Sequence, residues 1–154
     1  ASREFVSVSV SDHDIASWEN GTLEVIRAER RHEGRYICEA NNGVGSGLSK
    51  LVNLSVNEPP WFSAHNQQLS SVVGKMATLT CEAKGDTPLT ISWAKDGVDI
   101  SSMSRYGISE RDSDSGRVSE LVIRSTLVED SGRYICTATN AHGSMTADSH
   151  LLVQ

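Results

Sequence analysis

The chain has 154 residues, of which 38% are hydrophobic, and its 14 basic and 20 acidic residues give a formal net charge of −6. This mildly acidic balance provides no electrostatic basis for binding nucleic acid or an anionic membrane. The sequence contains no run of about 18 apolar residues, so attachment to a membrane is expected only through a segment outside this chain. The length suits about one and a half domains of ordinary size.

The most informative stretch lies near the C-terminus. Tyr134, Cys136 and Ala138 alternate, so one face of a β-strand carries all three. A tyrosine two residues before a cysteine is typical of strand F in an immunoglobulin domain, and Cys81 and Trp93 precede it in the order that such domains show. This resemblance predicts a disulfide between Cys81 and Cys136, packed against Trp93.

The same stretch occurs a second time. Tyr36 and Cys38 stand 98 residues before Tyr134 and Cys136. A period of this length indicates a tandem array of whole domains rather than a solenoid of short repeats. The alternating positions expected to face a core are Leu23, Val25, Tyr36, Cys38 and Ala40 in the first repeat, and Leu79, Cys81, Ala83, Ile91, Trp93, Leu121, Ile123 and Tyr134 in the second.

These repeats predict an all-β chain of tandem immunoglobulin-like (I-set) β-sandwiches, the first present only as its C-terminal half. We expect residues 1–57 to supply strands D to G of the first domain. Residues 58–60 are expected to form a short Pro-Pro linker, because proline fixes φ and removes a backbone donor. Residues 61–154 are expected to form a complete I-set domain.

Local patterns add three expectations. Residues 4–10 alternate as strand D of the first domain would. Residues 105–109 are expected to form strand D of the second domain, followed by a polar loop over residues 110–117. Asp96-Gly97 is typical of a two-residue hairpin turn.

Cys38 is left without a partner in this chain. By the repeat, its partner belongs on a strand B that would lie before residue 1, so we expect an internal piece of a longer chain, with Cys38 paired outside these residues. The alternative is a free thiol that is buried as a small hydrophobic side chain.

The chain is not expected to be an enzyme. The five histidines are scattered and none pairs with a cysteine at metal-ligand spacing, so neither a metal nor a cofactor is predicted. The sequence shows no nucleophile elbow and no phosphate-binding glycine loop. Asp112–Gly116 faintly resembles a calcium loop and Lys84–Asp86 an integrin-binding tripeptide, but solvated turns explain both better.

An ion pair is expected in the second domain. Arg105 and Asp130 hold the positions where I-set domains pair an arginine of strand D with the aspartate before the tyrosine corner. The first repeat offers Arg3 and His32 instead. His32 departs from the pattern, which leaves that ion pair open.

Two triplets have the sequence of a glycosylation acceptor, beginning at Asn20 and Asn53. Asn53 alternates out of phase with its apolar neighbours, so we expect it to face solvent. Candidates for an exposed apolar patch form no clear stripe; they are Trp18, Trp61, Phe62 and Met103.

Several less generic runs resemble the Down syndrome cell adhesion molecule (Dscam) family, and the match is similar to its arthropod members. These runs are Tyr36–Lys50, Ser55–Pro60 and Cys81–Asp86, and the last strand, ending at Gln154, resembles that of the immunoglobulin domain just before the family's fibronectin repeats. The resemblance implies the extracellular region of a single-pass protein of the cell surface. Such a protein binds the same protein on an apposed cell in neuronal self-recognition.

Within such a receptor, this domain pair is expected to act as a scaffold or as a weak self-association module that forms a weak homodimer. The alternative is a segment of a heterophilic immunoglobulin-superfamily receptor that binds another protein ligand. In both cases the expected partner is a protein.

Overall fold

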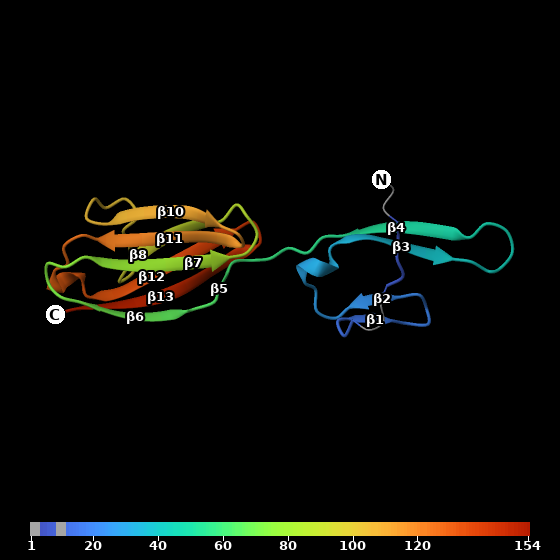
Figure 1. Cartoon of the computed structure of the whole chain (residues 1–154), viewed down its shortest axis with the longest axis horizontal. Helices are drawn as coiled ribbons and strands as arrows, with labels where there is room; N and C mark the ends of the chain where they lie inside the picture. The colour runs from blue at the N-terminus through green and yellow to red at the C-terminus, as the bar shows by residue number, and fades with distance from the viewer. Residues whose placement is uncertain (1–3, 9–11) are drawn as a thin grey trace. The chain divides into compact units, whose positions relative to one another are not determined.

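The computed structural model describes residues 4–8 and 12–154, and these residues form β-strands with two short 3₁₀ turns (Figure 1). The predicted all-β fold is confirmed. The chain divides into two compact units, Ala1–Asn57 and Glu58–Gln154. Within the described residues, no helix has the length and apolar character that crossing a bilayer requires.

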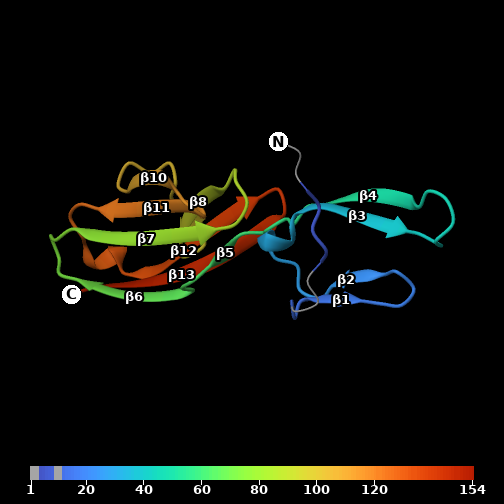
Figure 2. The ribbon, with the colours of Figure 1, turned by 45° about the vertical axis from the view of Figure 1, so that its right-hand side comes forward.

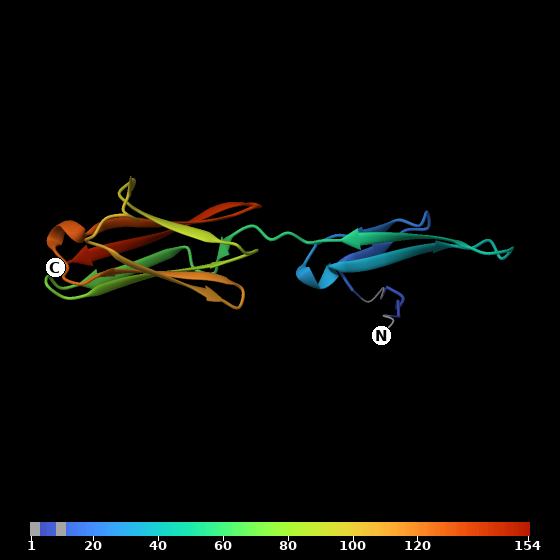
Figure 3. The same cartoon turned by 90° about the horizontal axis from the view of Figure 1, so that it is seen from above.

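The second unit is a sandwich of two sheets, seen as separate layers in Figure 3. One sheet has the strand order β10-β11-β7-β5 and the other β6-β13-β12-β8-β9. Neighbouring strands are antiparallel, except that β6 runs parallel to β13. The strands are β5 (Trp61–Phe62), β6 (Asn66–Ser71), β7 (Ala77–Lys84), β8 (Thr90–Lys95), β9 (Val98–Asp99), β10 (Gly107–Ser113), β11 (Gly116–Ile123), β12 (Gly132–Asn140) and β13 (Gly143–Val153), and the 3₁₀ turn η2 (Val128–Asp130) precedes β12.

Alternation along the strands places the core between the two sheets. On β7, Leu79, Cys81 and Ala83 are buried, whereas Thr80 and Glu82 between them are exposed. Because successive side chains point to opposite faces of a sheet, each sheet presents one apolar face to the other. The larger buried side chains are Phe62, Leu79, Leu89, Trp93, Ile100, Leu121, Ile123, Tyr134, Leu151 and Val153.

The hairpin of β10 and β11 corrects one prediction. Residues 105–109 were expected to end strand D before a polar loop over residues 110–117, but the strands continue and pair as far as Ser113 with Gly116. Since β10 lies at a sheet edge, its side chains need not be apolar. Arg117 also donates across the pair to Glu110, at 2.9 Å.

The turn between β8 and β9 has the predicted form. Asp96 and Gly97 have φ of 48° and 86°, and Lys95 pairs with Val98 on either side. Positive φ at both central residues gives the turn a twist that matches the flanking strands.

Residues 58–60, expected to be a linker, are fastened to the second unit. Glu58 N–H donates to Asp86 Oδ2 at 3.0 Å, and the side chain of Asn140 donates to the Glu58 carbonyl at 2.8 Å. Pro60 is buried. The Lys84–Asp86 triplet spans the last residue of β7 and the turn after it, and Asp86 accepts a hydrogen bond from the start of the unit.

The described residues of the first unit form two antiparallel hairpins, β1 with β2 and β3 with β4 (Figure 2). A 3₁₀ turn, η1, connects the two hairpins. The bounds are β1 (Ile15–Ser17), β2 (Leu23–Val25), η1 (Arg30–His32), β3 (Gly34–Ala40) and β4 (Leu48–Leu54).

Several predictions for the first unit are wrong. Residues 4–8 are not a strand, and residues 9 and 10 of that predicted strand lie outside the described residues, as does Arg3. Three residues that were expected to face a core, Leu23, Cys38 and Ala40, are exposed. Among the described strands, β2 pairs only with β1 and β3 only with β4, and neither hairpin buries these side chains. The repeated alternation thus produces burial in the second unit but not in the first.

Candidate functional site

The centre of the second unit combines a disulfide with a buried indole. Cys81 and Cys136 are joined, with their Cα atoms 6.4 Å apart. Trp93 is 1% exposed, and its Nε1–H donates to the hydroxyl of Ser119 at 2.9 Å. The role of Ser119 was not predicted from the sequence. It alternates with Leu121 on the inward face of β11, and a polar residue in such a position needs a hydrogen-bond partner. These contacts are structural and leave no reactive group exposed at this centre.

Both units contain a tyrosine corner. The hydroxyl of Tyr134 donates to the Asp130 carbonyl at 2.8 Å, and that of Tyr36 donates to the His32 carbonyl at 2.7 Å. Burial raises the pKa of Tyr134 well above its ordinary value, because the ring is fully inside. Tyr36 is only half-buried. The predicted core set of Trp93, Tyr134 and Leu121 is therefore buried, while Tyr36 lies at a partly open surface.

The structure brings Arg105 and Asp130 together. Arg105 Nε–H donates to Asp130 Oδ1 at 2.8 Å, and Leu127 N–H donates to Asp130 Oδ2 at 2.7 Å. Burial by itself would raise the pKa of Asp130, but the hydrogen bonds from Arg105 and Leu127 outweigh it and hold the pKa below its ordinary value. The charged carboxylate thus fastens η2 to the loop before β10.

His32 takes the place of Asp130 in the first unit. Its Nδ1 accepts the N–H of Glu29 at 2.9 Å, just as Asp130 accepts that of Leu127. Its Nε2 is buried, lacks a hydrogen bond among the described residues and lies 3.5 Å from Asp12 Oδ2. A histidine can therefore accept the same backbone hydrogen bond as the aspartate does, but its ring faces a carboxylate instead of an arginine.

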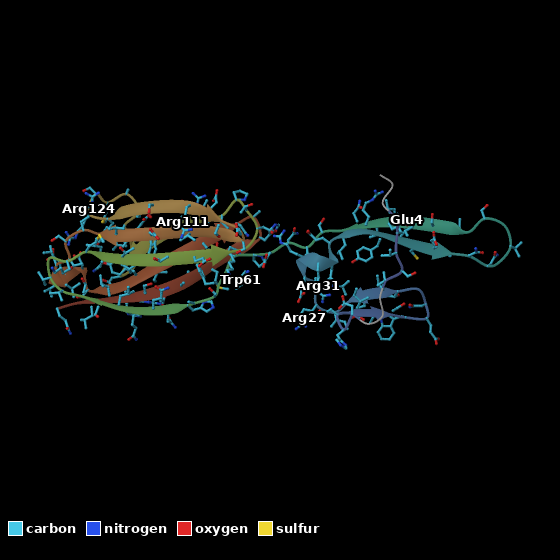
Figure 4. The ribbon with its side chains drawn as sticks, in the orientation of Figure 1. Glu4, Arg27, Arg31, Trp61, Arg111 and Arg124 are labelled. Carbon is cyan, nitrogen blue, oxygen red and sulfur yellow. A yellow bond between two sulfur atoms is a disulfide. The ribbon has the colours of Figure 1, made fainter. Side chains whose placement is uncertain are left out.

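Asp12, Asp14 and His32 lie close enough to be considered as metal ligands. However, Arg31 bridges the two carboxylates at 2.5 Å each, and its hydrogen bonds lower the pKa of Asp12 to about 2. Because Nδ1 of His32 accepts a backbone N–H, the neutral ring carries its proton on Nε2, where a metal would need a lone pair. Arg31, labelled in Figure 4, is the centre of a network of charged side chains that was not predicted from the sequence.

A family model for the immunoglobulin I-set domain matches residues 60–153. The chain belongs to the immunoglobulin I-set family. This match covers the unit that holds the disulfide, the buried indole and the ion pair described above. The fold class predicted from the spacing of those residues is therefore confirmed.

Known relatives of this I-set chain include cell adhesion molecules. Cell adhesion molecule Dscam1 of Drosophila melanogaster is 41% identical over 138 residues, which cover 88% of this chain and 7% of the relative. Hemicentin-1 of Mus musculus is 34% identical over 151 residues, or 98% of this chain and 2% of the relative. Cell adhesion molecule DSCAM of Homo sapiens is 30% identical over 136 residues, or 88% and 7%. The chain spans only a small part of each relative.

Solved structures agree with the family. A three-domain I-band fragment of titin superposes with a TM-score of 0.58 at 30% identity, covering 90% of this chain and 48% of that chain. Dpr2 Ig1-Ig2 in complex with DIP-Theta Ig1-Ig3 gives a TM-score of 0.63 at 24% identity, covering 94% and 52%. At that identity, the second likeness concerns the fold alone.

The surface of the I-set domain offers few aromatic side chains. Phe62, expected as an exposed candidate, is 4% exposed and belongs to the core. Trp61 on β5 (Figure 4) is 39% exposed, but Lys84 lies over its ring at 5.1 Å and its Nε1–H donates to Glu58 at 2.9 Å. Met103 is partly exposed and lies apart from Trp61 in the chain. Trp61 is therefore engaged within its own unit.

The two glycosylation acceptors lie in different local structures of the first unit. Asn20 is exposed at the tip of the hairpin between β1 and β2, whereas Asn53 is exposed within β4, opposite Arg35. Cys38 is exposed as a free thiol, so the alternative of a buried thiol is wrong for this chain. Among the described residues, the polar groups clustered around Asp130 and His32 make structural hydrogen bonds.

Proposed function

We propose that this chain is a segment of the extracellular region of a cell-surface adhesion receptor of the Dscam family. The receptor binds its own kind on an apposed cell in neuronal self-recognition, and a segment outside this chain anchors it in the membrane by a single pass. The domain pair contributes weak self-association or positions stronger recognition domains.

The observation that carries this proposal is the 41% identity to Dscam1 across 88% of the chain, a span that reaches into both units. Identity to the Drosophila relative exceeds the 30% identity to human DSCAM, which supports an arthropod-type member. The homology to cell adhesion molecules is also consistent with the buried polar groups of this chain, which make structural hydrogen bonds.

The surface supports weak rather than tight association. A stable interface buries about 1,600 Å² and is anchored by aromatic or arginine side chains near its centre. In the I-set unit, Trp61 is already held by Lys84 and Glu58, and Arg133 is paired with Asp148 at 2.6 Å. Adhesion then depends on many copies acting together on two membranes.

A heterophilic partner is the competing possibility, and bead aggregation separates the two. Beads of two colours are coated densely with the chain, and a third set carries an unrelated I-set domain pair as the control. We expect slow aggregation of beads that carry the chain, mixing of the two colours that share it, and exclusion of the control beads.

The possible results of this experiment distinguish homophilic from heterophilic adhesion. If the beads stay dispersed alone but aggregate with cells that express a different surface protein, the receptor is heterophilic and the homophilic proposal fails. If beads that carry the whole ectodomain also stay dispersed in every mixture, the adhesive function itself is wrong.

A further inference from the structure

The tip of the hairpin between β1 and β2 has a defined turn. Gly21 N–H donates to the Trp18 carbonyl at 3.0 Å, and Trp18 N–H donates to the Thr22 carbonyl at 2.9 Å. Gly21 has φ of 87°, which a glycine adopts without strain. This is a three-residue hairpin loop in which a turn is followed by a left-handed bulge residue.

The acceptor triplet Asn20-Gly21-Thr22 is built into this turn. Asn20 Oδ1 accepts the backbone N–H of Thr22 at 3.0 Å, so the side chain folds back over its own triplet. Asn20 is exposed, and the turn leaves it at the outermost point of the hairpin. The amide and the threonine that an oligosaccharide transferase must read together are therefore presented on one compact loop.

Trp18 shares a face of the hairpin with Thr22, the last residue of the triplet. Ser17 pairs with Leu23, so the next pair places Trp18 opposite Thr22, and directly opposed residues share a face. The indole is 57% exposed, and its Nε1–H donates to Glu24 Oε2 at 3.2 Å. That hydrogen bond orients a large apolar ring at the surface, close in the chain to the Asn20 amide.

We propose that Asn20 carries an N-linked glycan whose first sugar packs its C–H face against the Trp18 indole. The apolar side of a pyranose fits the flat face of an aromatic ring, and weak C–H contacts to the ring add to the burial. The inference rests on the proposed extracellular function, because glycosylation needs passage through the secretory route. It goes beyond the acceptor triplet, since it selects one asparagine and assigns a docking residue.

Transfer of the oligosaccharide to Asn20 forms one bond and breaks another. A bond forms between Asn20 Nδ2 and C1 of the first sugar, and the bond from C1 to the diphosphate of a lipid-linked oligosaccharide breaks. The lipid diphosphate leaves, and the proton lost from Nδ2 passes to a base of the transferase.

Asn53 is the internal comparison. It is exposed too, but it lies within β4 and pairs across to Arg35. Ser55 follows the last residue of β4, and extended backbone at Asn53 and Leu54 carries it roughly 7 Å along the chain. The end of the strand must therefore open before the Asn53 amide and Ser55 can be read together. We therefore expect lower occupancy at Asn53.

The test expresses the whole chain behind a secretion signal in insect cells and measures site occupancy by glycopeptide mass spectrometry. Trp18→Ala removes the docking ring, and Trp18→Tyr keeps an aromatic face. Trp61→Ala is the matched control, an exposed tryptophan of the other unit. Thr22→Ala and Ser55→Ala each remove one acceptor and identify its glycan.

We expect Asn20 to be occupied in most chains and more often than Asn53. Trp18→Ala should lower Asn20 occupancy by about threefold, while Trp18→Tyr and Trp61→Ala leave it nearly unchanged. In the glycosylated chain, the Gly21 amide should exchange its hydrogen about threefold more slowly than in Thr22→Ala, and Trp18→Ala should abolish that difference.

Equal or greater occupancy at Asn53, a bare Asn20, or the same result for Trp18→Ala and Trp61→Ala would overturn the inference. Occupancy is read by mass and does not depend on bead aggregation. A glycosylated Asn20 on beads that never aggregate therefore counts against adhesion alone, and aggregating beads with a bare Asn20 count against the glycan alone.

Discussion

At the scale of single residues, the second unit depends on buried polar groups that each have a partner. Asp130 is 2% exposed and is held by Arg105 and by the Leu127 amide. Removing one member of such a set leaves the other polar groups buried without a hydrogen-bond partner. The resulting loss of unfolding free energy exceeds the net stabilisation that the contact itself provides.

Asp130→Asn tests this set and its pH dependence. At pH 7 the variant should lose about 2 kcal/mol of unfolding free energy. This loss is smaller than that expected for a fully buried ion pair, because Arg105 is 38% exposed. Because folding lowers the pKa of Asp130, the stabilisation is present above its unfolded pKa of about 4 and is lost as the pH falls through the folded value.

Urea unfolding at several pH values between about 3 and 7 measures this difference. The matched control is Asp148→Asn, which breaks the exposed pair with Arg133 and should cost less than about 0.5 kcal/mol. A difference between the native chain and Asp130→Asn that stayed constant down to the lowest pH would contradict the assigned ion pair.

At the scale of elements, the two copies of one strand pattern meet different surroundings. Strand β12 lies between β13 and β8 and faces β7 across the disulfide, so Cys136 is buried. Strand β3 has the same alternation but, among the described strands, pairs only with β4, and Cys38 is exposed. Burial therefore belongs to the assembled sheets and not to the strand.

Cys38 reactivity follows from this difference. Under native conditions, iodoacetamide should label Cys38 in this chain and should leave Cys81 and Cys136 untouched, because they are joined and buried. We propose that the partner of Cys38 is a cysteine outside these residues. In a longer chain that places a cysteine opposite β3, labelling of Cys38 should disappear.

Peptide mapping by mass spectrometry reads both experiments. Label on Cys81 or Cys136 would show that the central disulfide is absent. Persistent label on Cys38 in the longer chain would show that it is a free thiol there as well.

At the scale of the whole molecule, the proposed self-association depends on how the exposed apolar side chains are distributed over the surface. The exposed apolar side chains of the second unit are spread over several strands and loops, among them Val72, Met76, Val98, Val128, Met145 and Leu152. Scattered apolar residues are normal on soluble domains and do not make a strong interface.

Sedimentation equilibrium should accordingly show self-association no tighter than about micromolar. Trp61→Ala should change the dissociation constant by less than about threefold, because Lys84 and Glu58 already engage that side chain within its own unit. A nanomolar dimer would refute the scaffold interpretation. Dissociation of such a dimer by Trp61→Ala would identify Trp61 as an interface anchor.

From the sequence by itself, the all-β I-set fold was determined, because it rests on local signals: alternation at period two, turn residues and the spacing of Cys81, Trp93 and Cys136. The edge strand β10 was missed in part, because charged residues at an edge resemble a loop until their cross-strand pairs are known.

Only the tertiary structure decided which equivalent residues are buried and which polar groups meet. His32 lies beside Asp12, 20 residues away in the chain, and no local pattern marks that approach. Asn20 and Asn53 both begin acceptor triplets, yet Asn20 lies in the turn that follows Trp18 and Asn53 lies within a strand. Local sequence sets the period of the backbone, but burial and proximity depend on strands that only folding brings together.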